Sequence, residues 1–136
     1  MATSILLVLI SFGVLAAAWY GRKYRRFHIA TMSAVVAFDV MFPFYLYLTH
    51  DWYTRLITHG DIFSFLIWTH LLFVMVLYAL YVLQILAGRA MLKHRMGDTF
   101  KYHREEHRKQ FLGILAARLL VFASGALLFV PTSAAN

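Results

Sequence analysis

The sequence predicts an all-α, polytopic membrane protein built as a four-transmembrane-helix bundle. Of its 136 residues, 62% are hydrophobic and 14% are charged, which is more apolar surface than a soluble domain of this length can enclose. The apolar residues form four long runs, and the last three approach or exceed the ~20 residues that cross ~30 Å of hydrocarbon. We therefore expect a single domain, residues 1–136, with spans at about 3–20, 28–50, 61–88 and 108–131.

The first two spans are expected to form a hairpin around a short basic turn. The apolar run from Ile5 to Trp19 is short, but it can extend through Met1 and Tyr20. Its positive charges follow the apolar stretch, whereas a cleaved signal peptide carries them before it, so we expect the segment to remain as a helix. In the second span, Pro43 lacks a backbone donor and predicts a kink.

The third and fourth spans are joined by residues 89–108, a long connection for a helical hairpin. We expect it to hold a short surface helix, with the segment YHREEHRK beginning the fourth span. Small residues four apart predict faces on which helices approach closely. Gly13 and Ala17 form one such pair in the first span, and Gly113 and Ala117 form another in the fourth.

The basic residues, which give the chain a formal net charge of +7, are distributed unevenly between the two expected sides of the membrane. Basic residues follow the first span and lie between the third and fourth, whereas the opposite side carries only Arg55. By the positive-inside rule, both basic loops lie in the cytoplasm and both termini on the outer side. This placement favours anionic lipid head groups as partners of the basic loops and argues against nucleic acid. The loop residues are Arg22, Lys23, Arg25, Arg26, Arg89, Lys93, Arg95, Lys101, Arg104, Arg108 and Lys109.

Asp39 is a carboxylate inside the apolar second span, and Arg118 lies equally deep in the fourth. Counted at 1.5 Å per residue from the cytoplasmic ends of their spans, they lie roughly 16 Å and roughly 13 Å deep. A lone charge at that depth costs at least ~2.5 kcal/mol and usually finds a partner. We therefore expect an intramembrane ion pair between Asp39 and Arg118. It would serve as a clamp on helix register, as a proton relay or ligand anchor, or as a contact with a partner subunit.

The histidines extend this pattern. His28, Asp39 and His50 are each 11 residues apart, which is three helical turns plus about 20°, so they lie along one stripe of the second span. His107 and Arg118 repeat the interval in the fourth span. If Asp39 meets Arg118, then His28 and His107 meet at the cytoplasmic edge.

Two imidazoles from separate helices at one height suit a bis-histidine haem b. Copper or another small metal ion is a second reading of His28 and His107, with His103 or Glu106 completing the site. The chain has no cysteine, which excludes thiolate ligands and covalent haem attachment through paired cysteines.

On the outer side, His50, His59 and His70 could form a second cluster if tilt or a kink brings them level. His70 lies well inside the third span, and Tyr81 and Gln84 follow it on the same face. The alternative is that the histidines are amphipathic anchors at the interface and hydrogen-bonded core residues.

The chain resembles a family of small bacterial four-helix, four-histidine membrane proteins of unknown function that are linked to haem-copper oxidase assembly. The resemblance covers residues 24–130 and lies in the segments YRRFHIATMSAVVAF, YLYLTH, FLIWTHLLFVMVL, HREEHRK and RLLVFASGALLF. It rests on His28, His50, His70, His103 or His107, and the glycine of the last span. It implies a multi-pass protein of the bacterial inner membrane with a role in oxidase maturation and in haem or copper handling.

Two functions from different classes follow. The first is a small accessory or assembly subunit of a respiratory or photosynthetic complex, with other integral-membrane subunits as partners. The second is a haem- or metal-binding bundle that transfers electrons or handles a cofactor. Asp39 and Arg118 depart from the family pattern, which favours a diverged copy recruited as a fixed subunit. No phosphate loop, nucleophile motif or metalloprotease histidine pair is found, so we do not expect an independent enzyme.

Overall fold

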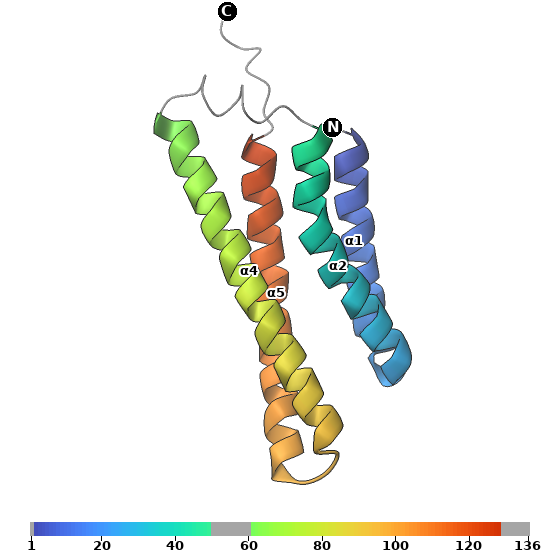
Figure 1. The fold of residues 1–136 in the computed structure, drawn as a ribbon. Coiled ribbons are helices and arrows are strands. Elements are labelled where there is room, and N and C mark those ends of the chain that lie inside the picture. The colour runs from blue at the N-terminus through green and yellow to red at the C-terminus, as the bar shows by residue number, and fades with distance from the viewer. Residues whose placement is uncertain (1, 50–60, 129–136) are drawn as a thin grey trace, which may run out of the picture. The chain divides into compact units, whose positions relative to one another are not determined.

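The computed structural model describes residues 2–49 and 61–128, and nearly all of them are helical (Figure 1). The four α-helices are each long and apolar enough to cross a membrane. This confirms the predicted all-α class with four helices of spanning length. The elements are α1 (Ala2–Tyr20), the 3₁₀ turn η1 (Gly21–Lys23), α2 (Arg25–Thr49), α4 (Asp61–Lys93) and α5 (Asp98–Leu128).

Helices α1 and α2 form an antiparallel hairpin within the first compact unit, Met1–Ile57. The buried residues of α1 are Ser11, Leu15 and Ala18, whose spacing of four and three places them on one helix face. Gly13 and Ala17 are exposed, and a Cβ atom built on Gly13 would meet nothing within 4 Å. Helix α2 therefore does not approach α1 at these two small residues, because the buried stripe runs along another face of α1; close approach by any other helix stays a prediction.

Helices α4 and α5 form the second hairpin, within the unit Thr58–Asn136. The residues of their packed faces recur at steps of three, four or seven, as on the facing sides of antiparallel packed helices. On α4 the buried positions are Leu77, Tyr81, Gln84 and Ala87, and on α5 the seam includes His107, Ile114, Ala117, Ser124 and Leu128.

Glycines lie where α4 and α5 approach each other. A Cβ atom on Gly113 would stand 3.5 Å from a methyl group of Leu80, and one on Gly88 would stand 3.8 Å from His107 Cε1. Ala117 is buried on the same face of α5. The predicted close-packing face at Gly113 and Ala117 is therefore confirmed.

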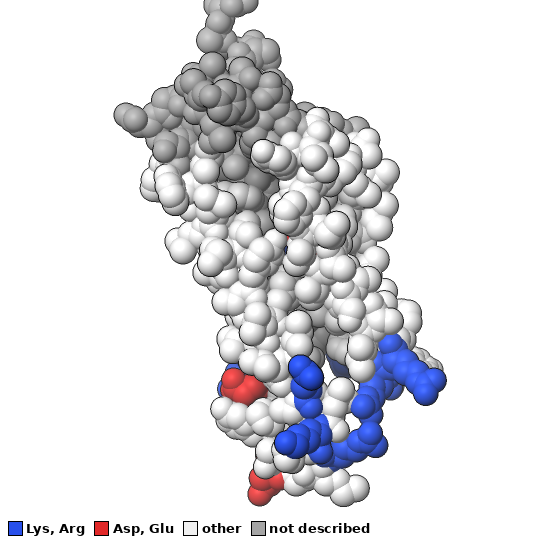
Figure 2. Space-filling view, in the orientation of Figure 1, with Lys and Arg blue, Asp and Glu red and all other residues white. Residues whose placement is uncertain are grey.

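The connection between α4 and α5 is much shorter than the predicted loop. It consists of residues 94–97 and turns at Gly97, whose φ of 92° favours glycine. No separate surface helix occurs in this part of the described chain. Instead, α5 begins ten residues before the predicted span, supported by ion pairs between Lys101 and Asp98 (3.8 Å) and between Lys109 and Glu105 (3.5 Å). Figure 2 shows the Lys and Arg side chains gathered at the turn ends of the hairpins.

Candidate functional site: histidines bonded within each hairpin

His28 ties the start of α2 to the end of α1. Its Nδ1 atom lies 2.9 Å from the carbonyl oxygen of Ala18, which belongs to the last turn of α1, where carbonyls run out of helical donors. Because a carbonyl can only accept, Nδ1 carries the proton and donates it. His28 therefore acts as a side-chain cap for α1.

His70 links α4 to α5 through a chain of two hydrogen bonds. Its Nδ1 atom lies 2.9 Å from Ser124 Oγ, and the hydroxyl of Ser124 donates to the carbonyl oxygen of Leu120 at 2.7 Å. Since the hydroxyl proton is used in the second bond, Ser124 Oγ accepts the proton of His70 Nδ1. Gly125 lies against the ring, and a Cβ atom there would stand 3.3 Å from Cε1 of His70. These contacts hold the orientation of the imidazole, and the tautomer with the proton on Nδ1 satisfies both hydrogen bonds.

His107 pairs with Gln84 across the same hairpin. The Nε2 atoms of the two side chains are 3.2 Å apart, so the Gln84 amide donates to the ring. The Oε1 atom of Gln84 is buried and has no hydrogen-bond partner among the described residues. Rotating the amide by 180° would let this oxygen accept a proton from His107 Nε2 instead. In either arrangement, Nε2 of His107 is engaged by Gln84.

The two charged residues that are expected to pair are both buried. Asp39 of α2 is 6% exposed, and Arg118 of α5 is 0% exposed. The guanidinium carbon of Arg118 lies 5.3 Å from the centroid of the Phe122 ring, one turn along α5, which is within the range of a cation–π contact. The two charges belong to separate compact units, so their ion pair stays a prediction.

The other predicted site residues are distributed along the chain. His103 is half-buried near the turn of the second hairpin, with its ring edge-on to Tyr102 at 5.3 Å. His50 and His59 lie outside the described residues. His28 and His107 belong to different units, so their meeting also stays a prediction. Within residues 2–49 and 61–128, no three His, Asp or Glu side chains form a group that could hold a metal ion.

Two of the partners are not predicted from the sequence. Ser124 is a single hydroxyl in an apolar span, and the carbonyl of Ala18 is a backbone group that no residue type reveals. Gln84 is different, because it lies with Tyr81 on the face of α4 that carries His70. Tyr81 is 3% exposed and Gln84 is 6% exposed, so this polar stripe is internal as expected.

Comparison with protein-family models, curated proteins and solved structures gives no match to this chain.

Proposed function

We propose that this chain is a four-span accessory or assembly subunit of a respiratory or photosynthetic complex in the bacterial inner membrane. In this proposal its termini face the outer side and its basic turns face the cytoplasm. The observation that carries the proposal is the use of the intramembrane histidines. His28, His70 and His107 each form a hydrogen bond within their own hairpin, which is what side chains that stabilise helix packing do.

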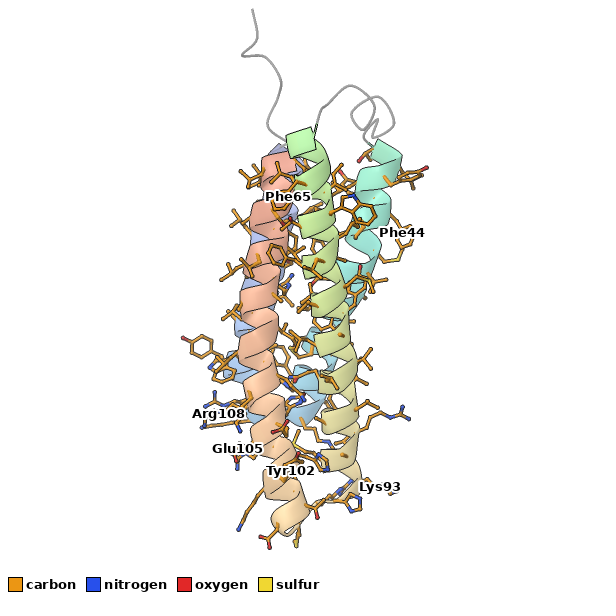
Figure 3. The ribbon with its side chains drawn as sticks, turned by 90° about the vertical axis from the view of Figure 1, so that its left-hand side faces the viewer. Phe44, Phe65, Lys93, Tyr102, Glu105 and Arg108 are labelled. Atoms are coloured by element: carbon orange, nitrogen blue, oxygen red, sulfur yellow. The ribbon has the colours of Figure 1, made fainter. Side chains whose placement is uncertain are left out.

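The outer surface supports membrane insertion. Large apolar side chains on all four helices are more than half exposed, far beyond the apolar patches that soluble monomers present to water. In a bilayer the same side chains face lipid tails or helices of partner subunits at no cost. Examples are Leu9 (62% exposed), Phe44 (62%), Phe65 (69%), Met75 (67%) and Leu127 (57%). Phe44 and Phe65 are labelled in Figure 3.

The two hairpins are proposed to assemble into one bundle through Asp39 and Arg118. Each is buried, and an ionised group left alone in hydrocarbon costs several kcal/mol. A pair between α2 and α5 would neutralise both and fix one hairpin against the other. This is the register-clamp role, which needs no chemistry at the site.

The choice of complex rests on the resemblance of the histidine-bearing segments to the oxidase-assembly family. A haem-copper oxidase is therefore the first complex to test. In a deletion strain, we expect the amount of assembled oxidase on native gels to fall while the amounts of other respiratory complexes stay constant. Complementation with the wild-type chain is expected to restore it. Unchanged amounts of every respiratory and photosynthetic complex would contradict the proposal.

A haem- or metal-binding bundle is a second candidate, favoured by the tautomers of two histidines. His28 and His70 both donate from Nδ1, and histidines that ligate a metal through Nε2 usually donate their other ring proton in this way. His28 and His107 would ligate the haem or metal, which would supply electron transfer when bound. However, Nε2 of His107 is engaged by Gln84, so ligation through that atom would have to displace the amide.

A further inference from the structure

All basic residues of the second hairpin except Arg95 lie on its two helices, because α4 continues to Lys93 and α5 begins at Asp98. Their heights can therefore be compared. The register between the helices follows from three contacts: His70 with Ser124, Leu80 with Gly113, and Gln84 with His107.

This register places Arg89 of α4 level with Arg104 of α5 to within about one residue, and Lys93 level with Lys101. Along α5, Arg108 lies about 6 Å from Arg104 in the direction of the apolar segment. Lys101 lies about 4.5 Å from Arg104 in the opposite direction. In Figure 3, Arg108, Glu105 and Tyr102 follow one another along α5, and Lys93 lies near the end of α4.

These heights can be set against a bilayer. We place the cytoplasmic edge of the hydrocarbon at Lys109, the last basic residue before the apolar segment of α5, because charged side chains avoid the hydrocarbon. The head-group layer then occupies the next 5 to 7 Å or so. The layer contains the headgroup-level arginines, which are Arg89, Arg104 and Arg108. The tip residues, Lys93, Arg95 and Lys101, lie beyond it.

Two lysines of this hairpin form ion pairs within the described residues, whereas Lys93 and Arg95 of the tip have no salt bridge there, like the headgroup-level arginines. Lys101 at the tip is paired with Asp98, and Lys109 is paired with Glu105. Within the described parts of the chain, no salt bridge joins a headgroup-level arginine to an acidic residue, and all three are exposed. Arg104 and Arg108 are one helical turn apart and so lie on one face of α5. A guanidinium matches a phosphate through two parallel hydrogen bonds.

We propose that the headgroup-level arginines bind the phosphates of anionic phospholipids in the cytoplasmic leaflet. This inference rests on the membrane insertion in the proposed function. An acidic protein surface approaching from the cytoplasm would meet the tip residues first, since they extend furthest from the apolar segment. The headgroup-level arginines instead lie at the height of the lipid phosphates.

The test compares two variants of the full chain that each lose three positive charges. One is Arg89→Gln, Arg104→Gln and Arg108→Gln together, and the other is Lys93→Gln, Arg95→Gln and Lys101→Gln together. Each protein is purified in a zwitterionic detergent and titrated with phosphatidylglycerol or phosphatidylcholine, and bound lipid is counted by native mass spectrometry. We expect the wild type to prefer phosphatidylglycerol. In the headgroup-level variant the preference for phosphatidylglycerol over phosphatidylcholine should fall at least tenfold, since each basic residue contributes about fivefold to binding. In the tip variant this preference should stay within about twofold of the wild-type value.

Equal losses in both variants would show that lipid binding depends on the total positive charge and not on the position of the arginines, which would overturn the proposal. A wild type with no preference between the two lipids would also overturn it. A larger loss in the tip variant would also overturn it and would point to an acidic protein partner. Inorganic phosphate should not displace the lipid; displacement would assign the arginines to a soluble phosphate. If the triple variant fails to fold by circular dichroism, the single variants Arg104→Gln and Lys101→Gln give the same comparison. Vesicle flotation tests the proposed membrane insertion separately from the proposed lipid binding. A chain that does not float with the vesicles would contradict membrane insertion itself.

Discussion

Replacing Ser124 by alanine should destabilise the α4–α5 hairpin by removing the acceptor of the His70 ring. The Nδ1–Oγ distance of 2.9 Å and the Oγ–Leu120 carbonyl distance of 2.7 Å describe two well-formed hydrogen bonds. The variant leaves a ring proton without its hydroxyl partner, a loss of ~1–3 kcal/mol for a buried group. Interhelical hydrogen bonds in membranes contribute less, ~0.6 kcal/mol on average and up to ~1.7. The carbonyl of Val121 is also an alternative acceptor for the ring, so we expect a loss of ~1–2 kcal/mol.

A double-mutant cycle isolates the contact. In a His70→Leu background the ring proton is gone, and the hydroxyl of Ser124 keeps its local bond to the backbone of α5. Ser124→Ala should then cost less than ~0.5 kcal/mol, leaving a coupling energy of ~1 kcal/mol. The four proteins are compared by reversible unfolding in mixed micelles of dodecyl maltoside and sodium dodecyl sulfate, followed by far-ultraviolet circular dichroism. If Ser124→Ala costs the same in both backgrounds, the His70 contact does not hold the hairpin together.

The remaining predictions use the same unfolding assay. Asp39→Ala alone should cost ~3–5 kcal/mol and more than Asp39→Ala with Arg118→Leu, because the single change leaves a buried cation without its counter-ion; additive losses would rule out the ion pair. His28→Ala should cost ~1 kcal/mol and speed hydrogen exchange in the last turn of α1, whose carbonyl it caps; unchanged exchange would contradict the capping role. Gly113→Ala should be neutral or stabilising by up to ~1 kcal/mol, since its Cβ would make ordinary contacts. Gly125→Ala should be less favourable than Gly113→Ala because its Cβ would crowd the fixed imidazole at 3.3 Å; equal effects would show that the ring yields freely.

The four long helices of the described residues could be predicted from the sequence, because a soluble domain of this length cannot enclose four apolar runs of this size. The ends of α4 and α5 could not. The predicted spans ended at residue 88 and began again at 108, with the segment YHREEHRK expected to lead into the fourth span, yet α4 continues to Lys93 and α5 begins at Asp98, where ion pairs support its first turns. The thickness of a membrane determines the length of the apolar segment but not the length of the helix. The polar turns beyond the apolar segment end where local ion pairs and the glycine that reverses the chain end them.

The candidate site shows a similar division. Burial of Asp39, Arg118 and Gln84 follows from their positions on helix stripes, and the structure buries all three. The bond from His28 to a carbonyl of α1 is different, because every residue has a carbonyl and only the helix end makes one available. The small-residue spacing predicted the packed face at Gly113 correctly, but α2 does not pack on the face at Gly13, since spacing alone does not say which of several apolar stripes is packed within a hairpin.

The measurement that tests the central claim most directly is a reduced-minus-oxidised absorbance spectrum of the detergent-purified chain, with metal analysis of the same sample. If the histidines serve helix packing, the protein should be colourless and free of bound metal, and His70→Leu should change its stability without changing its spectrum. A Soret band with split α and β bands that disappears in His28→Ala or His107→Ala would contradict this account and establish a haem-binding bundle.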